Sequence, residues 1–236
     1  MHLDTIDSTN SYVRRMISQG EAMPELTLVD ADCQTAGRGQ TGNSWESADG
    51  QNVQFSLVCH PSFLLASQQF LLSQAIALAV AETVGGTVKW PNDIYVGDRK
   101  ISGTLIECDL SGHQVETCII GTGINVNQTQ FLSDAPNPVS LSQLTGRQYD
   151  REQILRAVVD RFAYLYAMLR QGDVELVRRL YMQCLYRREG LHPFADVRGR
   201  FMARIHAIEP TGHLLLQTDG GDVRRYEFKE VKFLFD

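Results

Sequence analysis

The chain has 236 residues, of which 43% are hydrophobic and 21% charged, and its formal net charge is −6. This composition is that of a globular protein rather than a disordered one, and the length allows one large domain or a main domain with a small appendage. The acidic balance argues against a dedicated nucleic-acid surface, and the longest apolar run, residues 75–81, is far shorter than the roughly 18 residues of a membrane span.

The amino terminus lacks a basic segment followed by an apolar stretch, so no signal peptide is expected. Five cysteines are odd in number and widely spaced, without a CxxC pair. This pattern predicts neither a zinc site nor a disulfide framework, and it favours reduced thiols in a cytoplasmic protein. The cysteines are Cys33, Cys59, Cys108, Cys118 and Cys184.

Hydrophobic periodicity predicts a series of helices and strands. Alternating residues at 26–33 and 53–59 indicate two strands that flank a glycine-rich loop, and an Ala- and Leu-rich run that ends at Gly85-Gly86 indicates a mostly buried helix. In chain order we expect a short helix after Asn10 that Gly20 ends, strands at 26–33 and 53–59, a helix at 67–84, strands at 87–90, 94–96, 102–108 and 115–120, and a helix at 151–170.

After about residue 190 the pattern of predicted elements changes to short strands. Short strands at 201–208, 214–218 and 225–235 are separated by glycine-containing turns. Closely spaced strands of this kind predict a small β-barrel, which at about 45 residues packs on the main domain rather than folding alone. We therefore expect a main domain at 1–188 and a small barrel domain at 189–236.

Residues 37–42, GRGQTG, have the GxGxxG spacing of a dinucleotide-binding loop. The polar residues that follow cannot open a helix, and no acidic residue stands about 20 positions further on to hold a ribose. The loop is therefore a ligand loop of another kind, with one cation (Arg38) and one large aromatic residue (Trp45). A lone tryptophan is more often a core residue than a nucleotide stack, but the polar neighbours of Trp45 weaken the core interpretation.

Three other segments carry candidate chemistry, and each has an ordinary structural interpretation. KWPND at 89–93, followed by DRK at 98–100 and by Ser102-Gly103, places cations and a carboxylate on neighbouring strands, although a surface salt bridge on a hairpin explains them equally well. GTGINVN at 121–127 suits polar ligand recognition, or a glycine bulge with an asparagine turn. The polar residues at 8–10 suit a ligand contact or plain helix capping.

Taken in order, DSTN (7–10), QTAGRGQTGNSW (34–45), KWPND (89–93), DRKISG (98–103) and GTGINVN (121–127) resemble the catalytic domain of biotin–protein ligases. The resemblance covers residues 7–127, and a small C-terminal barrel is also typical of that family. It implies an α+β fold: a mixed or antiparallel sheet flanked by helices, like that of class II synthetases and lipoate ligases, followed by an SH3-like β-barrel. Lipoate ligases share the fold but not the KWPND–DRK–SG string.

The resemblance also implies an activity. Such ligases join biotin and ATP into biotinyl-5′-adenylate, with Mg²⁺ on the triphosphate, and pass biotin to a lysine of a biotin carboxyl carrier domain. A lipoate or octanoyl ligase or transferase is the alternative enzyme. A nucleic-acid-binding barrel protein, prompted by arginines at 178, 179, 187 and 188, is the non-enzyme alternative.

Neither a nucleic acid nor a membrane is expected as a partner, and the expected oligomeric state is a monomer or a weak homodimer. Because the chain begins just before the first motif, we expect no winged-helix domain and no repressor activity.

The resemblance assigns the site to polar, cationic and glycine positions around one lysine. Lys100 is the expected catalytic lysine between the biotin carboxylate and the α-phosphate, where a compact ammonium stabilises charge in both half-reactions. Arg38 and Asp93 complete the expected catalytic set, with Asp93 as a Mg²⁺ ligand or as the group that receives the incoming lysine amine. The expected biotin contacts are Ser8, Thr9, Asn10, Gln34, Gly37, Arg38, Gly39, Lys100, Gly103, Gly121 and Gly123. The expected ATP and adenylate contacts are Arg38, Gly39, Gln40, Trp45, Lys89, Asn92, Lys100 and Asn125.

The loop departs from the family pattern at Gln40, Thr41 and Asn43, where several relatives carry arginines. A less cationic loop is expected to retain the adenylate less tightly. We expect residues 37–51 to be mobile without ligand and to be ordered by biotinyl-adenylate.

Overall fold

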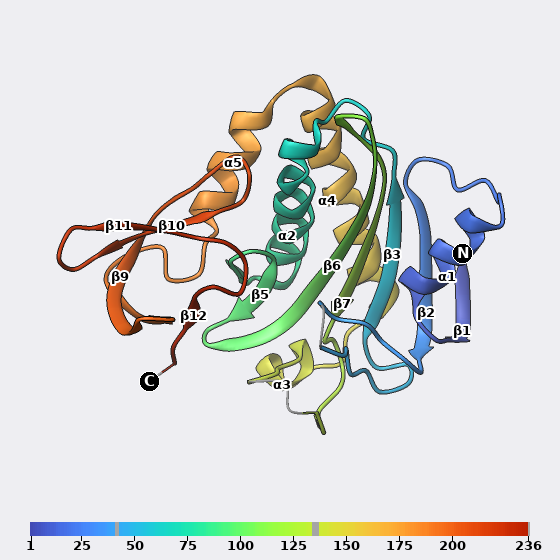
Figure 1. Ribbon diagram of the computed structural model, residues 1–236. Helices are drawn as coiled ribbons and strands as arrows, with labels where there is room; N and C mark the ends of the chain where they lie inside the picture. The colour runs from blue at the N-terminus through green and yellow to red at the C-terminus, as the bar shows by residue number, and fades with distance from the viewer. Residues whose placement is uncertain (41–42, 134–136, 236) are drawn as a thin grey trace.

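The computed structural model describes residues 1–40, 43–133 and 137–235 (Figure 1). Its larger sheet has the strand order β1–β2–β3–β7–β6–β5–β4. The first pair, β1 and β2, is parallel, and every later pair is antiparallel, so the sheet is mixed. The strands are β1 (His2–Ile6), β2 (Thr27–Gln34), β3 (Val53–Cys59), β4 (Thr87–Lys89), β5 (Asp93–Val96), β6 (Arg99–Ser111) and β7 (Gln114–Ile124).

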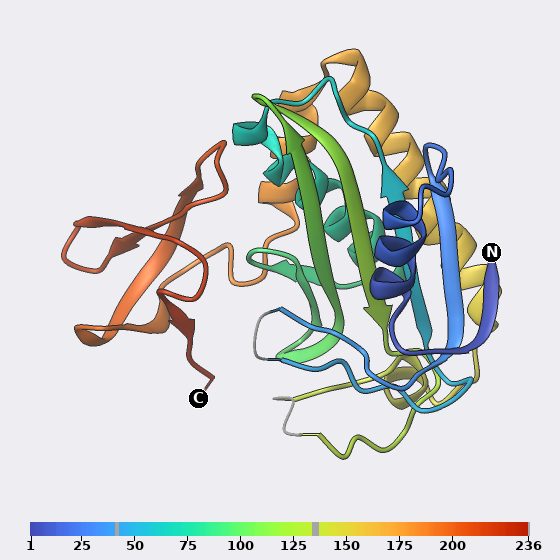
Figure 2. The ribbon, with the colours of Figure 1, turned by 45° about the vertical axis from the view of Figure 1, so that its right-hand side comes forward.

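Helices cover both faces of this sheet. The central helix α2 (Phe70–Val84) is buried almost all round, and it packs with α4 (Arg151–Gln171) and α5 (Val174–Gln183) over one face. The short helix α1 (Thr9–Ser18) packs against β3 and β7 on the other face (Figure 2). The predicted glycine stop is confirmed, because Gly85 caps α2 in the left-handed conformation with φ of 67°. Two smaller helices are a 3-10 helix at Ala66–Gln68 and α3 (Leu141–Thr145).

A second, antiparallel sheet follows α5, with the strand order β11–β10–β9–β8–β12. It joins the main sheet through aromatic contacts: Trp90 Nε1 donates to the carbonyl of Gly212 at 2.9 Å, and Tyr95 stacks on Phe235 with ring centroids 6.0 Å apart. The predicted fold class, a helix-flanked mixed sheet followed by a small barrel-like β unit, is confirmed. The strands are β8 (His192–Asp196), β9 (Gly199–Ile208), β10 (Leu214–Thr218), β11 (Val223–Tyr226) and β12 (Lys232–Phe233).

Several elements differ from the sequence prediction. The single strand expected at 225–235 is two strands, β11 and β12, with a turn between them, and β1, β8, α3 and α5 were not predicted. The expectation that all five cysteines are reduced is wrong for one pair. Cys108 and Cys118 face each other across β6 and β7 with their Cα atoms 4.2 Å apart, and they form a disulfide. No helix in the described ranges combines the length and apolarity needed to cross a bilayer.

Candidate active site

A cavity of about 180 Å³ lies on the α1 side of the main sheet. Its floor is formed by β6 and β7, and its walls come from the start of α1, the glycine loop and the KWPND segment. One wall residue, Phe228, comes from the segment between β11 and β12 of the C-terminal sheet. Among the residues predicted for the site, all line this cavity except Gly37, Asn92 and Asn125.

The start of α1 forms a hydrogen-bonded polar wall. Thr9 donates from its backbone N–H and its Oγ1 to Gln34 Oε1, at 2.8 and 3.2 Å, and Gln34 Nε2 donates to Gln54 Oε1 at 2.8 Å. Ser56 Oγ lies 2.8 Å from Thr9 Oγ1 and 2.6 Å from Asn10 Oδ1. These contacts fix both donors and acceptors before any ligand arrives. Gln54 and Ser56 were missed by sequence reasoning, although polar residues alternate with apolar ones along β3.

Ser8 has the capping role that its position allows, because its side chain accepts from the N–H of Ser11 at the start of α1. It is 3% exposed, as are its neighbours Thr9 and Asn10. Capping and cavity lining therefore coincide at this helix end.

The glycine loop folds back on itself as a short hairpin. Gly39 N–H donates to the carbonyl of Asn43 at 3.0 Å, and Trp45 N–H donates to the carbonyl of Gly37 at 2.9 Å. A Cβ at Gly37 would lie 2.4 Å from the carbonyl oxygen of Trp45, so the fold of this loop requires a glycine there. Thr41 and Gly42 lie outside the described residues.

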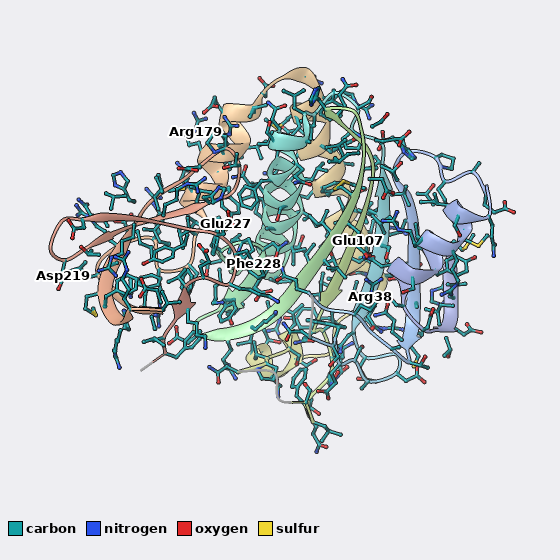
Figure 3. All side chains as sticks on the ribbon, in the orientation of Figure 1. Arg38, Glu107, Arg179, Asp219, Glu227 and Phe228 are labelled. Atoms are coloured by element: carbon teal, nitrogen blue, oxygen red, sulfur yellow. A yellow bond between two sulfur atoms is a disulfide. The ribbon has the colours of Figure 1, made fainter. Side chains whose placement is uncertain are left out.

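Arg38 is tied to the sheet by a carboxylate that sequence reasoning missed. Its Nη2 lies 2.9 Å from Glu107 Oε1, and Glu107 Oε2 accepts from Asn10 Nδ2 at 3.0 Å (Figure 3). Glu107 thus connects the loop to the polar wall at α1. The pair is 69 residues apart in sequence, so only the folded sheet brings it together.

Two glycines on β7 accommodate side chains of the protein itself. A Cβ at Gly123 would lie 2.2 Å from Trp45 Cε2, and a Cβ at Gly121 would lie 2.2 Å from Asn10 Oδ1. The indole of Trp45 therefore lies against Gly123. Its Nε1 is buried and has no hydrogen-bond partner among the described residues, which leaves a donor available within the cavity.

Lys100 and Asp93 form an ion pair in the cavity, with Nζ 2.7 Å from Oδ1 and each side chain 26% exposed. Gly103 leaves room for this pair, because a Cβ there would lie 3.2 Å from Lys100 Nζ. Lys89, on the neighbouring strand β4, is a second cation at the site. Burial lowers the pKa of Lys89, and its ammonium lies 5.3 Å from the ring centroid of Tyr95 and 5.1 Å from that of Phe233.

The remaining two predicted nucleotide contacts face elsewhere. Asn92 borders a groove next to the cavity, where its Nδ2 donates to Ser73 Oγ at 3.1 Å. Asn125 is buried behind the end of β7, and its Nδ2 donates to the carbonyl of Val139 at 3.1 Å. In both amides the Oδ1 atom is buried without a partner among the described residues.

The donor set gives little support to a metal held by the protein. Asp93 is the one carboxylate among the described residues that line the cavity, and Lys100 already neutralises it. The described part of the chain contains no group of three or more His, Cys, Asp or Glu side chains with the geometry of a metal site. The residues present do not fit a protein-held Mg²⁺, so no step is assigned to one.

The fold and cavity define a class of protein that binds a small ligand on an open mixed sheet, beneath a glycine loop and beside a lysine. The profile of the biotin/lipoate A/B protein ligase family matches residues 3–125. The bifunctional ligase/repressor BirA of Bacillus subtilis is 31% identical over 94% of this chain and 70% of the relative. The biotin–[acetyl-CoA-carboxylase] ligase of Paracoccus denitrificans is 32% identical over 69% of this chain and 71% of the relative. This chain belongs to the biotin/lipoate A/B protein ligase family.

Solved structures agree on the fold. Biotin protein ligase from Aquifex aeolicus, in complex with biotin and ATP, superposes with a TM-score of 0.80 at 24% identity, over 99% of this chain and 98% of that one. Biotin protein ligase from Leishmania major, in complex with biotinyl-5-AMP, has a TM-score of 0.64 at 22% identity.

Proposed function

We propose that this protein is an ATP-dependent biotin–protein ligase. It forms biotinyl-5′-AMP from biotin and ATP, and it then transfers biotin to one lysine of a biotin carboxyl carrier domain. The observation that carries the proposal is the Lys100–Asp93 pair, which faces a cavity with a fixed polar wall on one side and a glycine loop over it. Relatives named for this reaction support it.

In the first half-reaction a biotin carboxylate oxygen attacks the α-phosphorus of ATP, and pyrophosphate leaves. Two anions must meet, and the Lys100 ammonium stabilises both the approach and the charge that develops on the phosphate oxygens. Asp93 holds the ammonium in position at 2.7 Å. Lys89 adds positive charge on the same side of the cavity.

The polar wall at α1 suits the ureido ring of biotin, which presents both N–H donors and a carbonyl acceptor. Thr9, Asn10 and Gln34 offer hydroxyl and amide groups already oriented by their partners. Trp45 and Gln40 border the nucleotide side in this proposal, and Arg38 covers the reacting ends from the glycine loop.

The proposed partner is the carrier domain of a biotin-dependent carboxylase, and the proposed location is the cytoplasm, where ATP is supplied. The test is incubation of the purified protein with ATP, biotin and a purified carrier domain, followed by intact-mass analysis of the carrier. We expect one biotin per carrier domain, dependent on ATP. Attachment of lipoate but not biotin in parallel reactions would replace this proposal with the lipoate alternative.

A further inference from the structure

Gln54, near the start of β3, lies next to the polar wall but outside the cavity. It is 2% exposed, and it does not belong to the described residues that line the cavity. Gln34, at the end of β2, does line the cavity. The two side-chain amides are joined directly, because Gln34 Nε2 donates to Gln54 Oε1 at 2.8 Å. Gln54 can therefore act on a cavity residue without touching a ligand.

The two ends of this amide pair have an unambiguous hydrogen-bonding polarity. At one end the backbone N–H of Thr9 can only donate, and it donates to Gln34 Oε1 at 2.8 Å. At the other end the backbone carbonyl of Asp32 can only accept, and Gln54 Nε2 donates to it at 3.3 Å. A side-chain amide has its acceptor oxygen and its donor nitrogen on different sides. The backbone groups therefore fix the orientation of both glutamines, and the oxygen of Gln54 must face the nitrogen of Gln34.

This orientation determines what Gln34 offers to a ligand. Its Nε2 carries two N–H groups, of which Gln54 accepts one, and within the described residues the second has no acceptor. Nε2 lies beside the glycine loop, since a Cβ at Gly37 would lie 3.4 Å from it. Thr9 Oγ1 gives its proton to Gln34 Oε1 at 3.2 Å, so the hydroxyl oxygen presents an acceptor. A donor beside an acceptor matches the carbonyl and N–H groups of a urea.

The reversed orientation of the Gln34 amide would lose this match. Its nitrogen would then face the backbone N–H of Thr9, donor against donor, and its oxygen would replace the donor that the cavity wall presents. The hydrogen bond to Gln54 Oε1 opposes that reversal, and a hydrogen bond of this kind favours one arrangement about 2–12-fold. Gln54 thus contributes to the order of the wall before any ligand arrives.

We propose that Gln54 is a positioning residue for biotin recognition, whose carbonyl oxygen holds the Gln34 amide in the orientation that offers an N–H to the ureido oxygen. The proposal rests on the ligase function given above. Gln54 acts on one substrate and not on the reacting groups. Its loss should therefore raise the KM for biotin, while kcat and the KM for ATP stay nearly unchanged.

Three substitutions at position 54 separate the accepting role from the donating role. Gln54→Glu keeps an oxygen that accepts from Gln34 Nε2, Gln54→Lys keeps only donors, and Gln54→Met keeps neither. In biotin-dependent exchange of pyrophosphate into ATP, the Lys and Met variants should raise the KM for biotin about 3–10-fold, whereas the Glu variant should stay within about twofold. A normal KM in Gln54→Lys, equal increases in the Lys and Glu variants, or a matching rise in the KM for ATP would overturn the proposal.

A double-mutant cycle tests whether Gln54 acts through Gln34. Methionine is close to glutamine in size and flexibility, so Gln54→Met keeps the packing of β3. In a Gln34→Leu background there is no amide to orient, and Gln54→Met should then cause no further rise in the KM for biotin. Additive increases would show that Gln54 supports the sheet rather than Gln34, and they would overturn the proposal.

The matched control is Arg151→Met. It removes the ion pair between Arg151 and Asp32 at 2.8 Å, but it leaves the bond between Gln34 and Gln54 in place. Its KM for biotin should stay within about twofold of the unmodified protein, with a small decrease in the midpoint of thermal unfolding. An equal rise in KM in this control would assign the effect to stability and overturn the proposal. Absence of biotin-dependent exchange in the unmodified protein would instead refute the ligase function itself.

Discussion

Gly123→Ala is the sharpest test of how the glycine loop is seated. An added Cβ would lie 2.2 Å from Trp45 Cε2, whereas ordinary contacts begin at 3.4 Å, so the indole must leave its position. Gly123 lies within β7 and does not require a positive φ, so the strand itself accepts alanine. We expect the free energy of unfolding to change by less than about 1 kcal/mol. Loss of the indole contact is worth roughly 1–2 kcal/mol on the nucleotide side, which raises the KM for ATP by about 5–30-fold.

The assay combines pyrophosphate exchange with acrylamide quenching of tryptophan fluorescence. The chain has two tryptophans, and Trp90 is 4% exposed, so an increase in quenching reports on Trp45. The matched control is Gly121→Ala, two residues along the same strand, whose Cβ would displace Asn10 instead. That variant should weaken biotin more than ATP and leave the quenching unchanged. Equal effects of the two variants on both substrates, or unchanged quenching in Gly123→Ala, would refute the reasoning.

Three further predictions concern charged groups. Lys100→Met should slow pyrophosphate exchange about 10²–10³-fold. The midpoint of thermal unfolding should shift little, because a partly exposed ion pair contributes at most about 1 kcal/mol to stability. Near-normal exchange would remove Lys100 from the mechanism. Glu107→Gln should raise the KM for biotin by up to about fivefold, and it should have no added effect in an Arg38→Ala background; additive effects would show that the two residues act separately. Burial lowers the pKa of Lys89 in the folded protein. Between that lowered pKa and the unfolded value of about 10.4, the unfolded chain binds more protons than the folded one, so the free energy of unfolding rises with pH. Urea unfolding of Lys89→Met at a series of pH values should lack this rise, and an unchanged dependence of the free energy of unfolding on pH would contradict the lowered pKa.

The sequence predicted the parts of the site that lie within short motifs. Ser8, Thr9 and Asn10 form a local helix start, and Lys100 and Asp93 lie on adjacent strands of one hairpin, so spacing alone brings each group together. It could not predict groups that meet through long-range pairing. Asn10 reaches Glu107 across 97 residues of sequence, through the packing of α1 on the sheet.

The missed helix α5 has a different cause. Arginines at 178 and 179 suggested a basic cluster, but the segment is amphipathic: Val177 and Tyr181 are buried, and Arg178 pairs with Glu175 one turn earlier. The cysteine prediction failed because spacing along the chain does not reveal register. Cys108 and Cys118 are ten residues apart, and only the pairing of β6 with β7 places them opposite each other.

The GxGxxG spacing has a conformational explanation in the described part of the loop. Gly37 is required because a Cβ there would lie 2.4 Å from the carbonyl oxygen of Trp45, and a Cβ at Gly39 would lie 3.2 Å from Asn43. Both glycines therefore serve the close return of one hairpin strand on the other, not the wrapping of a phosphate by a helix start. The hairpin places Arg38 against Glu107 on β6 and Trp45 against Gly123 on β7. One loop thus brings a cation and an aromatic side chain to the cavity.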